Sequence, residues 1–191
     1  MNESRSCRRA AMVGALTLLC VVATVSSAAI IEIDLSAAAA VAGNAGSPPL
    51  HLARFDLPGH LADADIDLAV VEFCADVDCE AEVGGITLNA YLVTEDWEAG
   101  LVDWDGFHRG GNEPFDRSLR AMWGTAAGDS TLVRLDVTEM VALWADGSTT
   151  NRGLALIPAT GDQAAFRPAL AGAGRGRSAR LTIWYTPLAS P

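Results

Sequence analysis

Residues that could carry out catalysis are few in this sequence. Beyond residue 28 the histidines are His51, His60 and His108, and none lies in a recognisable nucleophile or metal motif. The chain contains no Gly-x-Ser-x-Gly, no His-Glu-x-x-His and no phosphate-binding loop. Carboxylates are so abundant that an acid–base pair could be chosen from almost any region, so their number carries no information. The sequence predicts a non-catalytic protein, with an enzyme of polysaccharide turnover as a weaker alternative.

Aromatic side chains could bind a sugar instead, because a sugar ring can stack on the flat face of an indole or a phenol. Trp144 shares a helical stripe with apolar residues and is expected in the core. Trp184 lies out of phase with the apolar residues around it, which places it on the solvent-facing side of a strand. The predicted aromatic ligand-binding residues are Trp184, Trp123 and Tyr91.

Arginines form two clusters, and the chain has no lysine. The electrostatic fields of the two clusters would add at a bound acidic glycan if both clusters lay on one face, within ~15 Å of each other. The alternative is that each arginine neutralises nearby acids on a separate surface. The candidates are Arg109, Arg117 and Arg120 in one segment and Arg175, Arg177 and Arg180 in the other.

Acidic residues also cluster, which raises the question of a metal ion. Calcium prefers six to eight oxygen ligands of this type. A solvated acidic surface explains the clusters more simply, so we expect no cofactor, with a structural calcium ion as the alternative. The clusters are Asp63, Asp65 and Asp67, and then Asp76, Asp78, Glu80 and Glu82.

The amino terminus is typical of an export signal. Arg8 and Arg9 precede an apolar run, Met12–Val25, that ends in the small residues Ser26-Ser27-Ala28. We predict a signal peptide over residues 1–28 and an extracellular location, with association with the cell surface. An uncleaved membrane anchor is the alternative.

Cys74 and Cys79 are the two cysteines that remain after residue 28. In an oxidising compartment, a pair this close in sequence most simply forms one local disulfide. A zinc site would need four ligands, and no suitable pair of histidines accompanies the cysteines. We therefore predict a Cys74–Cys79 disulfide and no metal.

The charge excludes two classes of partner. Removing residues 1–28 takes three of the 13 basic residues and one of the 24 acidic ones, so the formal net charge changes from −11 to −13. Such a surface repels phosphate backbones and anionic lipids, which are bound by basic patches. We expect no nucleic-acid partner, and no membrane partner after signal cleavage.

The elements that position these residues are predicted to be short strands. Ile66, Leu68 and Val70 alternate with aspartates, and Ile86–Leu92 and Arg180–Thr186 alternate in the same way. One helix, about residues 137–146, is indicated by an apolar stripe, and Asp136 and Gly147 are suited to its ends. Further strands are expected at 52–57, 132–135 and 153–157. Residues 36–49 and 104–121 are predicted to be irregular, the second as a long exposed loop.

Several ordered phrases resemble the secreted DNRLRE (disaggregatase-related) domain. They are Leu52–Leu57 with Ala64–Leu68, Leu92–Trp97 with Val102–Trp104, Leu135–Gly147 with Asn151–Leu156, and Ala179–Pro187. The resemblance implies that Trp97 and Trp104 are packing residues. It covers roughly residues 50–187. The chain departs from the family pattern at residues 36–49 and 171–177, and at the insertions around Cys74–Cys79 and Arg109–Arg120.

Together these features predict an all-β, antiparallel, jelly-roll-like β-sandwich over residues 50–188, preceded by a flexible segment or first strand over residues 29–49. The resemblance implies a non-catalytic carbohydrate-binding or extracellular-matrix module whose partner is a polysaccharide or cell-surface glycan. The alternative is a structural subunit of a surface layer, sheath or adhesive assembly.

Overall fold

The computed structural model describes residues 27–41, 50–75, 85–107, 113–124, 132–160, 166, 168, 170 and 178–188, apart from the side chains of residues 104, 106 and 160. Two helices and one 3-10 turn occur there: η1 (Gly59–Asp63), α1 (Trp104–Phe107) and α2 (Thr138–Ala145). The strands are β1 (Ala29–Asp34), β2 (Ala37–Val41), β3 (Leu50–Arg54), β4 (Ala64–Cys74), β5 (Thr87–Val93), β6 (Phe115–Gly124), β7 (Leu132–Asp136), β8 (Leu154–Thr160) and β9 (Arg180–Pro187).

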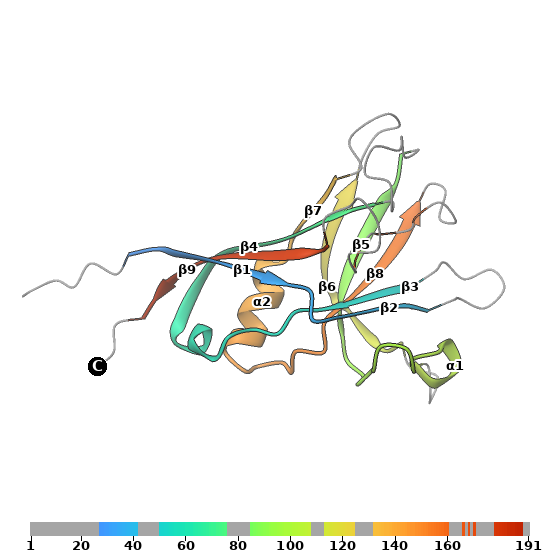
Figure 1. Ribbon diagram of the computed structural model, residues 1–191, viewed down its shortest axis with the longest axis horizontal. Coiled ribbons are helices and arrows are strands. Elements are labelled where there is room, and N and C mark those ends of the chain that lie inside the picture. Colours follow the sequence, from blue (N-terminus) through green and yellow to red (C-terminus); the bar gives the residue numbers. More distant parts are fainter. Residues whose placement is uncertain are drawn as a thin grey trace, which may run out of the picture.

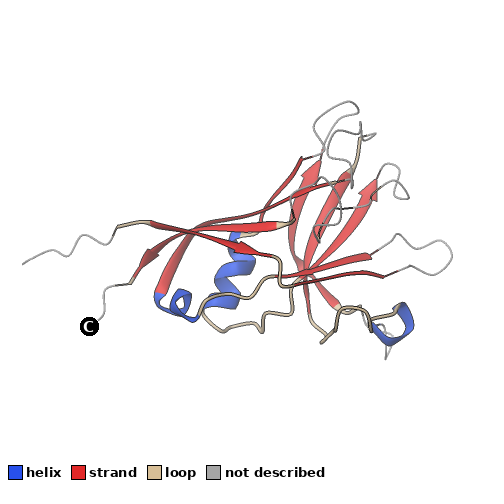
Figure 2. Ribbon diagram, viewed as in Figure 1, coloured by secondary structure: helices blue, strands red, loops and turns tan. Residues whose placement is uncertain are grey.

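The strands form two antiparallel sheets that pack face to face (Figure 1). Sheet A has the order β1-β9-β4-β7, and sheet B has the order β2-β3-β8-β5-β6. With the edge strand β2 set aside, this is the strand order of a jelly roll, in which strands close in space are distant in sequence. The predicted all-β sandwich is therefore confirmed (Figure 2).

The core lies between the two sheets and is built by strand alternation. Alternate residues of each strand point inward, so one apolar set from sheet A meets another from sheet B. The inward residues are completely buried at positions such as Leu88, Leu135, Leu156 and Ile183. The short helix α2 packs against β4 and closes one side of this core.

Helix α2 forms where the sequence predicts it. The stripe Val137, Met140, Val141 and Trp144 is buried in the main core. At its start, the Asp136 carboxylate accepts hydrogen bonds from the backbone N–H of Thr138 at 3.0 Å and from its hydroxyl at 2.6 Å.

Two segments predicted to be irregular are strands instead. Ala37–Val41 forms β2, the edge of sheet B beside β3, where alanines fit a small space but give almost no hydrophobic pattern. Phe115–Gly124 forms β6, the other edge of sheet B, and its charged residues point to solvent. The prediction was wrong at both places because neither segment shows the regular alternation of apolar and polar residues that identifies a half-buried strand.

The side-chain phase of β4 also differs from the prediction. The pairing with β9 shifts between Ile66 and Leu68, which is a β-bulge at Asp67. Ile66 packs against the core, but after the bulge Ala69 and Val71 point inward, and Leu68 points outward. The extra residue therefore moves Leu68 to the solvent-facing side.

Within the described ranges, no helix is both long and apolar enough to cross a bilayer. The predicted signal segment lies almost entirely outside those ranges, which begin at residue 27. Cys74 is buried at the end of β4, whereas Cys79 lies outside the described residues. The Cys74–Cys79 disulfide and the signal peptide thus stay predictions.

Candidate ligand-binding face

The outer faces of the two sheets differ in how they are covered. On sheet B, a second apolar cluster forms between the strands and the segment that runs from Trp97 to Phe107. Trp97 is buried there, and its indole N–H donates a 2.6 Å hydrogen bond to the carbonyl oxygen of Arg152. Sheet A has no comparable apolar cluster on its outer side among the described residues. Within the described part of the protein, sheet A therefore carries the open face.

Trp184 lies at the centre of this open face, half-buried between two apolar neighbours. In the strand register, Trp184 of β9 is opposite Ile30 of β1 on one side and Leu68 of β4 on the other. Ile30 is 63% exposed and Leu68 is 37% exposed. We call Ile30, Trp184 and Leu68 the apolar row. It is a flat apolar strip across three strands, with an indole in the middle.

A row of alternating charge crosses sheet A a few residues away. It consists of Asp34, Arg180, Glu72 and Arg134, one from each strand. Arg180 contacts Glu32 at 2.8 Å and Asp34 at 3.7 Å, and Arg134 contacts Glu72 at 2.6 Å. These exposed pairs add little stability. Their effect is to hold planar hydrogen-bonding groups in fixed positions beside the apolar row.

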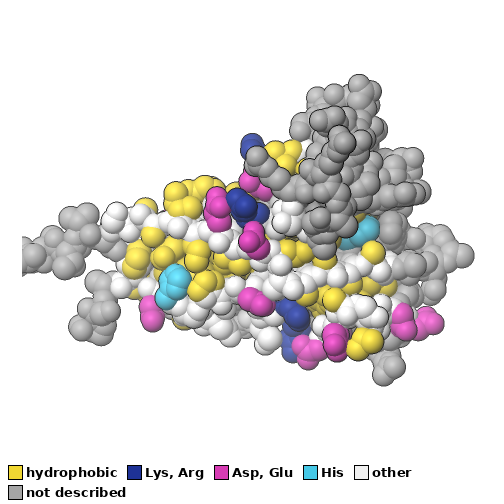
Figure 3. All heavy atoms as spheres, in the orientation of Figure 1, with side chains coloured by type: hydrophobic (Ala, Val, Ile, Leu, Met, Phe, Trp, Pro, Cys, Tyr) yellow, Lys and Arg dark blue, Asp and Glu magenta, His cyan; other side chains and the backbone are white. Residues whose placement is uncertain are grey.

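Polar groups also fill the space around the indole. Thr182 lies between the two rows and is 8% exposed. On the other side of the apolar row, the Thr186 hydroxyl donates a 2.9 Å hydrogen bond to Asp67. Beyond the charged row, a cavity of about 130 Å³ is lined by Glu72, Leu132, Arg134, Ser178 and Arg180, among others. Figure 3 shows hydrophobic side chains over the part of the molecule formed by β1 and β9, next to acidic and basic ones.

The other predicted aromatic residues do not join Trp184. Tyr91 is on the outer side of sheet B but is only 5% exposed, because it stacks on Phe115 at 5.5 Å between ring centres. Arg117 covers both rings at 5.3 and 5.1 Å. Trp123 lies on β6 and packs against the main core. Neither ring offers the open face that Trp184 does.

The described arginines do not share one surface. Arg117 is paired with Glu113 over the outer side of sheet B, and this hydrogen bond raises the pKa of Arg117 above its usual value. Arg120 is exposed on β6 of the same sheet. Arg180 is paired on the outer face of sheet A. The shared face is therefore not formed by these three, and Arg109, Arg175 and Arg177 lie outside the described residues.

Metal ligands are not gathered in the part of the chain that the structure describes. No group of three or more His, Cys, Asp or Glu side chains is placed there to hold an ion. Asp63, Asp65 and Asp67 are in or beside β4, and the acidic residues of 76–82 lie outside the described ranges. Calcium binding stays a prediction.

His51 is a half-buried titratable residue on β3. Its Nε2 atom is buried without a hydrogen-bond partner, and its ring meets Phe166 edge to face at 5.3 Å. Burial lowers the pKa of His51 from 6.5 to about 4, and a hydrogen bond with the Phe166 backbone opposes this shift only partly. The folded protein therefore contains neutral His51 at pH 7.

This burial predicts a loss of stability in acid. Because the folded-state pKa is the lower one, the unfolded chain takes up the proton first, and the free energy of unfolding falls as pH drops from 6.5 to 4. The loss should reach ~3 kcal/mol at the lower end. His51→Gln, which cannot titrate, should lack this component in urea unfolding measured across the range. His60→Gln, which removes an exposed imidazole, is the control. Parallel pH profiles for wild type and His51→Gln would contradict the prediction.

Sequence reasoning missed the neighbours of Trp184. The phase of Ala29–Asp34 carried a usable signal, since Ile31 and Ile33 alternate with the outward Ile30, Glu32 and Asp34. Leu68 gave no signal, because only the bulge in β4 turns it outward. The pairing of β1, β4 and β9 joins residues far apart in sequence.

Fold and face together define the class of protein: an antiparallel β-sandwich with one covered sheet and one sheet that presents an indole to solvent. No protein-family model matches the chain, and no curated protein does. The resemblance to the DNRLRE domain accordingly stays a prediction from sequence.

Proposed function

We propose that this protein is an exported, non-catalytic binding module that holds a glycan on the outer face of sheet A. The observation that carries the proposal is the position of Trp184, a centrally placed indole with an apolar neighbour on each side in the register. Sugar rings present a flat C–H face and a hydroxyl rim. The apolar row suits the first, and the polar groups of Arg180 and Glu72 suit the second.

Charge favours a neutral glycan over a polyanionic one. Both arginines of this face are already paired with carboxylates, so a uronate or sulfate would meet more negative than positive charge. The acidic side chains of the face are Glu32, Asp34, Asp65, Asp67, Glu72 and Asp136, and its cations are Arg134 and Arg180.

A structural subunit of a surface assembly is the second candidate. Ile30 is the observation that favours it, because it is 63% exposed on an edge strand, where another copy could pack. A protein partner would cover the same apolar row. The two functions therefore differ in what occupies one face.

Removal of the indole tests the glycan proposal. We expect Trp184→Ala to weaken binding to its best neutral oligosaccharide about 30-fold, or ~2 kcal/mol, which is the usual effect of removing a central aromatic contact. Binding of oligosaccharides from cellulose, xylan, mannan and chitin would be measured by calorimetry, with a uronate polymer as the anionic comparison.

Met122→Ala is the matched control, because Met122 is 60% exposed but belongs to sheet B. It should leave binding unchanged, and both variants should keep the wild-type far-UV spectrum. Equal binding by wild type and Trp184→Ala would overturn this site. Concentration-dependent assembly without glycan binding, abolished by Ile30→Ser, would support the structural subunit instead.

A further inference from the structure

A second open feature lies on the opposite sheet, at the edge formed by β6. This strand is the last of sheet B and pairs with β5 only. The edge of a sheet presents backbone N–H and C=O groups that can pair with another chain. In the described part of the protein, no backbone hydrogen bond joins Leu119–Met122 to a segment other than β5. Strand β7 also comes close to β6, and the cavity described next lies between this stretch and the residues at the end of β7 and the start of α2. Among the described residues, the outer backbone groups of the stretch are thus unpaired.

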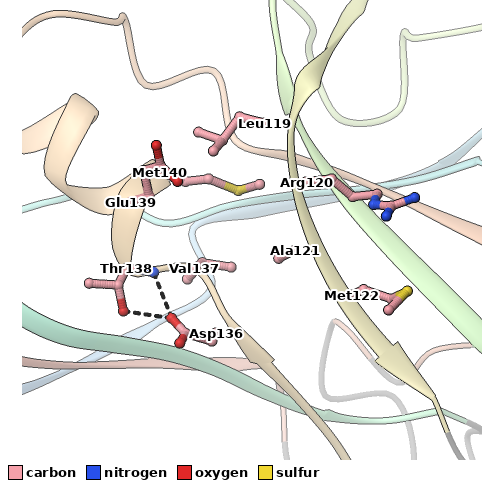
Figure 4. Close-up of a pocket in the computed structure, with 9 residues that line it drawn as sticks. All are labelled: Leu119, Arg120, Ala121, Met122, Asp136, Val137, Thr138, Glu139 and Met140. Carbon is pink, nitrogen blue, oxygen red and sulfur yellow. Dashed lines mark hydrogen bonds between the residues drawn. The ribbon is translucent and has the colours of Figure 1, made fainter.

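A cavity of about 430 Å³ opens along this edge, between β6 and the start of α2. Four consecutive residues of β6, Leu119 to Met122, line it. Consecutive residues of a strand point to opposite sides, so a cavity lined by all four faces the backbone edge rather than either side of the sheet. In Figure 4, Leu119 and Ala121 point toward Met140 of α2, while Arg120 and Met122 point to the other side of β6.

The strand is irregular at the start of this stretch. Tyr91 of β5 is opposite Arg120, but the next residue, Leu92, is opposite Asp116. Arg117, Ser118 and Leu119 are therefore extra residues that leave the ladder. The bulge separates the Phe115 end of β6, which is held by the aromatic cluster of sheet B, from the edge that borders the cavity.

The lining combines an apolar floor with acidic residues at the opening. Leu119, Ala121, Val137 and Met140 pack against or belong to the core, whereas Asp136 and Glu139 are exposed. Arg120 also borders the cavity, but its side chain extends to the other side of β6 from Glu139 (Figure 4). The Asp136 Oδ1 atom is engaged by Thr138, which fixes that carboxylate in place. An aliphatic stem with a cationic end matches this lining, and that is the chemistry of a lysine or arginine side chain.

We propose that the β6 edge and this cavity bind an extended segment of a basic partner protein, which adds a strand to sheet B. The segment's backbone pairs with Leu119–Met122, and one of its lysine or arginine side chains enters the cavity toward Asp136 and Glu139. The negative charge of the whole chain, formally −11, favours a basic partner over a second copy of itself. This site lies apart from the apolar row on sheet A, although Asp136 borders both surfaces.

The test uses two short synthetic peptides, one alternating lysine with valine and one alternating glutamate with valine. We expect the lysine peptide to bind the purified protein and the glutamate peptide not to bind. On binding, hydrogen exchange should slow at Leu119–Met122. Glu139→Lys should weaken the lysine peptide about tenfold, as expected for the loss of a close charge pair.

Glu95→Lys is the matched control, because it changes the net charge equally at an exposed position outside the cavity lining. It should leave binding within about twofold of wild type. Equal losses in both variants would show attraction by net charge alone and overturn the site. Absence of lysine-peptide binding, slowed exchange on another strand, or protection of β6 by self-association without peptide would overturn it too.

Discussion

Gly153→Ala is expected to destabilise the protein by about 3–5 kcal/mol, through the combined cost of a left-handed backbone and a steric clash. Gly153 has φ of +89°, which L-residues rarely adopt. A Cβ atom there would press into the carbonyl oxygen of Ala53, and it would lie 3.1 Å from the Ala53 carbonyl carbon and from the Arg54 Cα. All three are backbone atoms of β3, so none of them can move away as the end of a flexible side chain could.

The same residue holds neighbouring strands together. The backbone N–H of Val93 donates a 3.0 Å hydrogen bond to the carbonyl oxygen of Gly153. The N–H of Gly153 donates to the side chain of Asn151, whose amide in turn donates to the carbonyl oxygen of Phe55 at 2.7 Å. Moving the Gly153 backbone to relieve the clash would therefore disturb contacts with both β5 and the end of β3.

Gly147→Ala separates the two contributions. Gly147 has a similar φ of +77°, but nothing lies within 4 Å of a Cβ placed on it. Its substitution should cost only ~1–2 kcal/mol, the penalty of the left-handed backbone. Urea unfolding of the two variants measures the difference. Equal midpoints would show that the approach to Ala53 is relieved without cost.

The sequence allowed most strands to be predicted, and the exceptions share a cause. Alternation identified β5 and β9, and the helical stripe identified α2. β2 and β6 were missed because their apolar signal is weak, whereas the edge strand β7 alternates clearly and was predicted. β2 is mostly alanine, and β6 has charged residues and a bulge. Alternation along the sequence identifies a strand only where the side chains that face the core are strongly apolar.

The sequence predicted which side of its strand Trp184 occupies, but not which residues surround it. The phase of β9 placed Trp184 correctly on the outer side. Tyr91 had the same outward phase, yet it is buried because Phe115 and the segment after Trp97 cover that side of sheet B. Alternation along one strand shows which side chains face outward. It does not show which of the two outer faces is covered by another segment, because that depends on tertiary packing.

Trp144→Ala should also cost about 3–5 kcal/mol, as the removal of a large core side chain. Trp144 is 7% exposed and packs in the main core with Met140 and Val141. Helix α2 has only 8 residues, too few to be stable in water by itself. Its place against β4 therefore depends on this buried stripe, and the loss of the indole both leaves a cavity and weakens the docking of the helix.

Trp184→Ala is the matched comparison, since it removes the same side chain from the solvent-facing side of sheet A. We expect it to cost less, about 1–2 kcal/mol, because part of the indole is already in water. Urea unfolding followed by far-UV circular dichroism gives both values. The comparison decides between the roles of the two tryptophans. If Trp184→Ala were the more destabilising change, the apolar row would be a structural part of the sandwich, and a binding face built on it would lose its main support.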